Sequence, residues 1–89
     1  MTSRTLHIVN EKGLHARASA KFVECVEGFD ANAEVTKDGM TVSGDSIMGL
    51  LMLGASRGTA ISVVTNGTDA HALADALEHL VANRFGEAQ

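Results

Sequence analysis

Gly13-Leu14-His15-Ala16-Arg17 is the stretch in which the hydrophobic period of the chain changes from that of a strand to that of a helix. Before it, Leu6 and Ile8 alternate with residues 5, 7 and 9, as on a half-buried strand. After it, apolar residues recur at steps of three and four, which indicates a helix that ends near Gly28; they are Ala18, Phe22, Cys25, Val26 and Phe29. His15 is therefore expected where the helix begins, and a helix N-terminus favours anions.

Three further strand segments follow from alternation and turn residues. Residues 33–35 and 40–42 alternate on either side of Asp38-Gly39, a dipeptide typical of hairpin turns that need positive φ. Ile61 and Val63 indicate a fourth strand, which Asn66-Gly67 ends.

Two further helices are expected after the hairpin. Ser46 opens a short apolar stretch, residues 47–53, that Gly54 stops. The last helix has the clearest period, over residues 70–81, with Thr68 or Asp69 as its cap and Arg84 in its last turn.

The element order is thus β-α-β-β-α-β-α, which predicts an α+β fold. A four-stranded, mostly antiparallel sheet with three helices on one face buries both sets of apolar residues most simply, giving an open-faced two-layer sandwich. The other face of the sheet is expected to be solvated, because it would carry Thr5, His7, Glu34, Thr36, Thr41 and Ser62.

Composition narrows the class of protein. The 89 residues suffice for a single domain, 1–89. A net charge of −4 and only 3% aromatic residues argue against nucleic-acid binding. A lone cysteine (Cys25), no signal-peptide pattern and no long apolar run predict a cytoplasmic protein without membrane contact.

His15 is the candidate reactive residue. Lys12, Arg17 and Lys21 form a local basic cluster around it in an otherwise acidic chain. No serine and acid complete a hydrolase triad, no second histidine has zinc-ligand spacing, and no phosphate-binding glycine loop indicates a nucleotide, so we expect neither metal nor cofactor. A neutral imidazole is nucleophilic near neutral pH, and arginine matches phosphate oxygens. We therefore expect His15 to accept a phosphoryl group that Arg17 and the backbone N–H of Ala16 stabilise.

The Gly13–Arg17 motif and a second motif, Ser46-Ile47-Met48-Gly49-Leu50-Leu51, lie at a separation similar to that of HPr. The chain resembles this histidine-containing phosphocarrier of the phosphoenolpyruvate-dependent phosphotransferase system over nearly its whole length. The resemblance implies that Enzyme I, charged by phosphoenolpyruvate, phosphorylates His15 on Nδ1. The protein would then pass the group to an Enzyme IIA protein, as a carrier without turnover of its own. It also implies a sheet order of 1-4-2-3. The proline usual in the family after the arginine is replaced by Ala18.

The second motif suggests regulation and docking. Serine is a good N-cap, which by itself explains Ser46; the resemblance adds phosphorylation of Ser46 by an HPr kinase/phosphorylase. The helix after it is too apolar to be buried on every side, so part of it should be an exposed patch. The resemblance makes this patch the partner-docking surface, with the residues Ala20, Lys21, Glu24, Ile47, Met48 and Leu51. The protein is expected to be a monomer, in either a sugar-transport or a nitrogen-related branch of the system.

Two other functions remain open from the residues. One is a regulatory binding module that presents the Ser46 surface and in which His15 is incidental. The other is a small-molecule-binding domain that holds an anion at the helix N-terminus.

Overall fold

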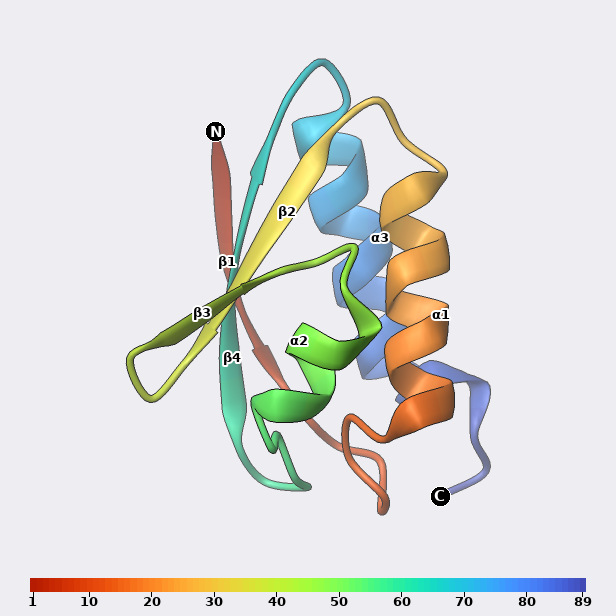
Figure 1. The fold of residues 1–89 in the computed structure, drawn as a ribbon. Helices are drawn as coiled ribbons and strands as arrows, with labels where there is room; N and C mark the ends of the chain where they lie inside the picture. Colours follow the sequence, from red (N-terminus) through yellow and green to blue (C-terminus); the bar gives the residue numbers. More distant parts are fainter.

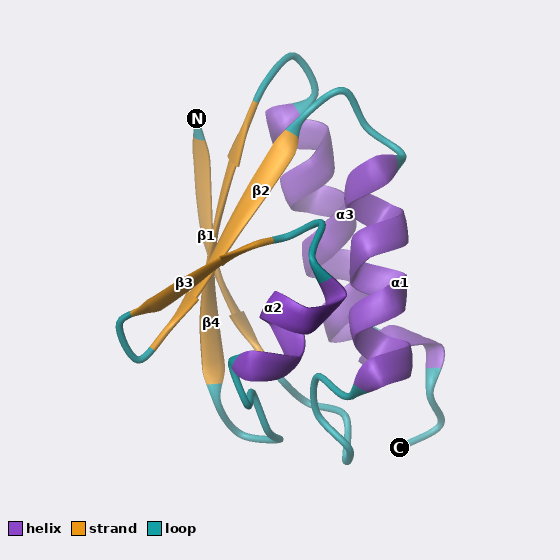
Figure 2. Ribbon diagram, in the orientation of Figure 1, coloured by secondary structure: helices purple, strands orange, loops and turns teal.

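The sheet of this protein is covered on one face by helices and open on the other (Figure 1). We describe all residues, 1–89, from a computed structural model. Along the chain the elements are β1 (Thr2–His7), α1 (Ala16–Glu27), β2 (Asn32–Lys37), β3 (Met40–Ser43), α2 (Ile47–Met52), β4 (Ala60–Asn66), α3 (Ala70–Ala82) and a short 3-10 turn, η1 (Arg84–Gly86). Figure 2 shows the helices gathered into one layer and the strands into the other.

The strands pair in the order β1-β4-β2-β3, and all neighbours are antiparallel. β4 therefore lies inside the sheet, with Ile61 opposite Leu6 of β1 and Val63 opposite Val35 of β2. The predicted α+β sandwich and its 1-4-2-3 order are confirmed.

The core lies between the two layers, because the inner strands β2 and β4 alternate between buried residues and more exposed ones. Ala33 and Val35 of β2 and Ile61 and Val63 of β4 face the helices and are buried. The helices add a larger apolar set, which comprises Ala18, Phe22, Val23, Val26, Leu50, Leu73, Leu77 and Val81. The residues predicted for the open face are exposed or half-buried, as expected.

The hairpin between β2 and β3 turns where the sequence predicted. Asp38 has φ of 51° and Gly39 has φ of 82°. Two consecutive left-handed residues form the two-residue turn whose twist matches that of the strands.

Three local expectations are corrected. β1 ends at His7, although Ile8 still bonds across to Thr59 O (2.9 Å). α3 ends at Ala82, so Arg84 lies beyond its last turn, because Arg84 has φ of 56° and cannot continue a right-handed helix. Asp69 is the N-cap residue, but its carboxylate accepts from Asp30 N (2.8 Å) instead of from the helix; it thereby ties the loop after α1 to the start of α3.

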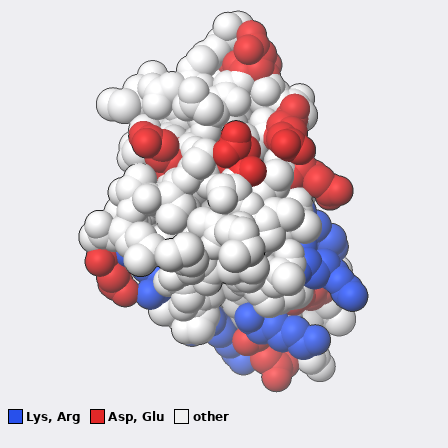
Figure 3. All heavy atoms as spheres, in the orientation of Figure 1, with Lys and Arg blue, Asp and Glu red and all other residues white.

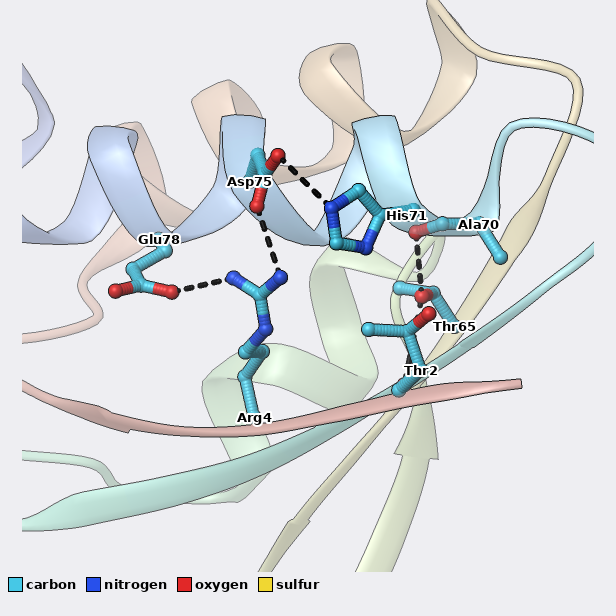
Figure 4. A network of polar contacts seen from close by, with 7 residues as sticks. All are labelled: Thr2, Arg4, Thr65, Ala70, His71, Asp75 and Glu78. Atoms are coloured by element: carbon cyan, nitrogen blue, oxygen red, sulfur yellow. Dashed lines mark hydrogen bonds and ion pairs between the residues drawn. The ribbon is translucent and has the colours of Figure 1, made fainter.

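A polar network that the sequence did not indicate joins β1 to α3 (Figure 4). The Arg4 guanidinium reaches from β1 to Asp75 (2.8 Å) and Glu78 (2.6 Å) of α3. The hydrogen bonds that Arg4 donates to these two carboxylates raise its pKa above the ordinary value. The pairs are largely exposed, so each contributes little to stability, but they connect α3 to the edge strand β1.

No helix of the protein combines the length and the apolar character that crossing a bilayer needs.

Candidate functional site

His15 occupies the N-cap position of α1, with extended backbone (φ −78°, ψ −177°). Its carbonyl accepts the first helical hydrogen bond, from Ser19 N (2.8 Å), while its side chain makes no capping bond. The imidazole is therefore not used to hold the helix, and 27% of the side chain is exposed. The first-turn N–H groups, beginning with those of Ala16 and Arg17, have no acceptor within the helix.

The loop before His15 is pinned to the segment after α2. Gly13 is left-handed (φ 66°), and a Cβ at this position would lie 2.5 Å from Ala55 O. The next residue, Leu14, is buried and donates its N–H to the same carbonyl at 2.8 Å. Only glycine allows this approach, so Gly13 sets the distance between the His15 loop and the rest of the fold.

The segment 84–89 folds back over the start of α1. Arg84, Phe85 and Gly86 have consecutive positive φ values of 56°, 55° and 79°, which reverse the chain after α3. The Phe85 side chain is fully buried, and its carbonyl accepts a hydrogen bond from Lys21 Nζ (2.7 Å). Burial of a phenylalanine side chain, worth about 1.5–3 kcal/mol, offsets the strain of its left-handed backbone.

This reversal brings Glu87 against the candidate nucleophile. One carboxylate oxygen of Glu87 forms a short contact with His15 Nε2, while His15 Nδ1 has no hydrogen-bond partner. The other oxygen accepts from Asn10 Nδ2 (3.0 Å), which also donates to Gly13 O (2.8 Å). Asn10 thus connects the His15 loop to the segment 84–89.

The Glu87 carboxylate is ionised at neutral pH. Partial desolvation acts to raise its pKa, but the hydrogen bonds from Asn10 and His15 and the charges of His15 and Lys12 outweigh it. The pKa of Glu87 is therefore below its ordinary value of 4.5.

An open cavity of about 480 Å³ lies beside this group; its lining is Glu11, Lys12, His15, Ala16, Arg17, Glu87, Ala88 and Gln89. Lys12 and Arg17 are exposed and form no hydrogen bond or ion pair within the protein, so both cations are free to contact a ligand. On the face seen in Figure 3, lysine and arginine gather toward the end where α1 begins, with some acidic side chains among them. The cavity thus combines a histidine, two free cations and a helix N-terminus, which suits a transient anionic group.

The second motif forms a separate feature on the same side of the fold. Ser46 caps α2, with its Oγ accepting from Gly49 N at 3.0 Å. Leu50 and Leu53 are buried, whereas the other apolar side chains of this segment project outward; they are Ile47 (41% exposed), Met48 (70%), Leu51 (37%) and Met52 (66%). We call these four residues the α2 patch. The middle of the face in Figure 3, over α2, carries little charge.

The other residues predicted for docking lie on α1, which packs against α2. Glu24 is exposed and Ala20 is half-buried. Lys21 is half-buried, and its ammonium group donates to Phe85 O as described above. Cys25, expected to face inward, is half-buried against the core, and desolvation raises the pKa of its thiol.

Sequence reasoning missed Asn10, Phe85 and Glu87. Phe85 offered a signal, because a lone large apolar residue after the last helix indicates a segment that docks on the core. Asn10 and Glu87 offered none: each is a polar residue in a loop, and the contact of Glu87 with His15 spans 72 positions.

Comparison with known proteins places this chain in a family. Residues 2–83 match the family model described as the PTS HPr component phosphorylation site. The phosphocarrier protein HPr of Cupriavidus necator is 42% identical over 89 residues, which is all of both chains. Among solved structures, HPr-C-His of Thermoanaerobacter tengcongensis superposes with a TM-score of 0.95 at 37% identity, over all of both chains. An HPr dimer from the same organism gives a TM-score of 0.77 at 38% identity, over 98% of this chain and 100% of that one.

The fold and the matches define a small phosphocarrier of the phosphotransferase system. The chain belongs to the HPr family.

Proposed function

We propose that this protein carries a phosphoryl group on His15, received from phospho-Enzyme I and passed to an Enzyme IIA protein. The observation that carries this proposal is the placement of His15 at the start of α1 with an unbonded Nδ1, beside the unpaired Lys12 and Arg17. Membership in a phosphocarrier family supports the same role.

The geometry suits a carrier better than an enzyme that retains its product. The first-turn N–H groups, Arg17 and Lys12 offset the charge of a phosphoryl group on His15. The cavity that holds them is open, so solvent weakens each of these contacts. The group is thus stabilised enough to persist and held loosely enough to be transferred.

Docking of both partners is assigned to the α2 patch and the neighbouring surface of α1, at Ala20, Lys21 and Glu24. The α2 patch leaves four large apolar side chains exposed on a short helix, and exposed apolar side chains of this kind mark interaction surfaces. Its two methionines are flexible and polarisable, which suits a surface that must fit an Enzyme I and an Enzyme IIA. The protein is proposed to act as a cytoplasmic monomer without nucleic-acid or membrane partners.

Ser46 is proposed as a regulatory site for an HPr kinase/phosphorylase. Its hydroxyl is half-buried at the N-terminus of α2, directly before Ile47 and Met48 of the α2 patch. A phosphate there gains from the helix N-terminus and adds a charge of about −2 next to the patch. The charge opposes docking without any change of fold.

The carrier role is tested by incubating the protein with Enzyme I and labelled phosphoenolpyruvate. We expect label on the wild-type protein that is lost in acid and survives alkali, as for phosphohistidine, and no label on His15→Ala. Label that survives acid, or that persists in His15→Ala, would contradict the carrier role. Labelling of Ser46 by a kinase has the opposite acid and alkali stability, so the same treatment separates the two sites.

A further inference from the structure

The segment 84–89 contributes a charged group to a site that His15 and Arg17 were expected to form without it. Three features position Glu87: the left-handed turn at 84–86, the buried Phe85, and the hydrogen bond from Glu11 N to Gln89 O (3.0 Å). The turn and the buried Phe85 constrain the segment before Glu87, and the bond to Gln89 O constrains it after Glu87. The contact of Glu87 with His15 is therefore made by a segment that the rest of the fold holds in place.

The contact determines which nitrogen of His15 carries a proton. An ionised carboxylate can only accept hydrogen bonds, so Nε2 must be the donor in its contact with Glu87. In the neutral ring the lone pair then resides on Nδ1, the nitrogen without a partner. We infer that Glu87 is a positioning residue, which holds His15 in the tautomer and orientation that present the Nδ1 lone pair to phosphorus. This inference rests on the proposed phosphoacceptor role of His15.

The transfer step balances with Glu87 in this role. The Nδ1 lone pair forms the new N–P bond, while the bond from phosphorus to the donor breaks and its electron pair remains with the donor. Nε2 keeps its proton, so the phosphorylated ring is cationic. The Glu87 carboxylate offsets that positive charge through the hydrogen bond it already makes, and no proton has to move.

Asn10 fixes the orientation of the Glu87 carboxylate, which supports the positioning role of Glu87. Its side chain is fully buried, and its Nδ2 donates to two acceptors, Gly13 O and Glu87 Oε1. Rotating the amide would place Oδ1 against both acceptors, so Oδ1 is left buried without a partner. An unpaired buried acceptor costs about 1–3 kcal/mol, a cost expected where a polar group is kept for a purpose other than stability.

The orientation of Asn10 makes two substitutions at Glu87 differ in their expected effect on His15. In Glu87→Gln, Asn10 Nδ2 still needs an acceptor, so the amide oxygen of the glutamine turns to Asn10 and its NH₂ group turns to His15 Nε2. An NH₂ group can only donate, so Nε2 must accept and the proton moves to Nδ1, which blocks the nucleophilic atom. Glu87→Ala removes the hydrogen bond that favours the Nε2–H tautomer of His15, but it supplies no donor that would favour the Nδ1–H tautomer. The nearly isosteric variant is thus expected to be the worse of the two.

The experiment measures the nitrogen-15 shifts of His15 in the unphosphorylated protein and the initial rate of phosphorylation by phospho-Enzyme I. We expect the Nε2–H tautomer in the wild type, a mixture in Glu87→Ala, and predominantly Nδ1–H in Glu87→Gln. The rate should fall about 10- to 100-fold in Glu87→Ala, the usual cost of losing a carboxylate that orients a histidine, and further in Glu87→Gln. Glu27→Gln is the control, since Glu27 is exposed at the other end of α1 and loses the same charge without lining the cavity.

Each outcome decides the inference. Unchanged tautomers in both Glu87 variants, or a Glu87→Gln rate equal to or above that of Glu87→Ala, overturn the positioning role. An equal loss in Glu27→Gln would assign the effect to net charge and overturn it as well. If the wild type accepts no acid-labile phosphate, the proposed function fails, while the nitrogen-15 shifts still decide the role of Glu87.

Discussion

At the scale of single residues, the site depends on a glycine as much as on the groups that do chemistry. Gly13 allows the His15 loop to rest on the Ala55 carbonyl, and the next residue, Leu14, donates a hydrogen bond to that carbonyl. A side chain here would push the loop away and move His15 relative to Glu87. We therefore expect a substitution at Gly13 to change both the stability and the proposed phosphoryl acceptance.

Gly13→Ala tests this link, with Gly54→Ala as its matched control. Both glycines are left-handed, at φ of 66° and 61°, but a Cβ at Gly54 meets nothing within 4 Å. Gly54→Ala should cost only the backbone strain, about 1–2 kcal/mol. Gly13→Ala adds a backbone collision of the kind that costs about 1–3 kcal/mol more, and it should slow phosphorylation. Urea unfolding measures the first effect, and equal losses in the two variants would contradict it.

At the scale of elements, α2 combines an N-cap and an exposed patch within six residues. The Ser46 hydroxyl stabilises the helix through Gly49 N, and the outward side chains begin at the next position, Ile47. A modification of the cap thus acts directly beside the patch. Two effects have to be separated, namely loss of the helix and repulsion of a partner.

The variants Ser46→Ala and Ser46→Asp separate loss of the helix from repulsion of a partner. Ser46→Ala removes the cap and should lower the free energy of unfolding by about 0.5–2 kcal/mol, with little change in the rate of phosphorylation by Enzyme I. Ser46→Asp keeps a good cap and should be near wild-type in stability, yet it should slow phosphorylation about tenfold through like-charge repulsion. Raising the salt concentration should reduce that defect, because screening weakens repulsion. A salt-independent defect, or unchanged kinetics in Ser46→Asp, would contradict repulsion.

At the scale of the whole molecule, charge and apolar surface are segregated. On the face in Figure 3, basic side chains gather near the start of α1 together with some acidic ones, several acidic side chains lie toward the opposite end, and the middle, over α2, carries little charge. A protein with a net charge of −4 thereby places the exposed cations Lys12 and Arg17 beside His15, among the carboxylates of Glu11 and Glu87. Such a distribution orients an approaching partner before apolar contact begins.

Met48 and Met40 provide a matched pair for testing the docking surface. Both are exposed methionines, at 70% and 43%, but Met48 belongs to the α2 patch and Met40 to the start of β3. Met48→Ser should lower kcat/KM for phosphorylation by Enzyme I about tenfold, as expected when a docking contact worth about 1.4 kcal/mol is lost. Met40→Ser should leave it unchanged, and both variants should keep wild-type stability within about 0.5 kcal/mol. Equal kinetics in the two variants would place docking elsewhere.

The elements of the fold could be predicted because the information for each is local, whereas the 1-4-2-3 strand order came from the resemblance to HPr. The alternation around Val35 and Val63, the Asp38-Gly39 turn and the helical period after Ala16 each specify an element within a few residues. The start of α1, and therefore the placement of His15, followed in the same way.

Glu87 could not be predicted, because its position depends on backbone conformations that the sequence does not signal. Arg84 and Phe85 are left-handed although neither is a residue that favours positive φ, and this turn directs Glu87 to His15. The hydrogen bond of Lys21 could not be predicted for the same reason. Its charge was visible in the sequence, but its contact with Phe85 O depends on that turn.

The strand order also has a consequence for folding while the chain is synthesised on the ribosome. β1 pairs only with β4, and Thr2 and Thr65, which face each other across that pair, are 63 positions apart. At roughly 5–20 residues per second, β1 waits about 3–12 s for its partner after it has been made. During that time both of its hydrogen-bonding edges are open, and Leu6 and Ile8 have no core to enter. Two nascent chains in close proximity can therefore exchange first strands, which makes strand exchange the characteristic assembly error of this topology.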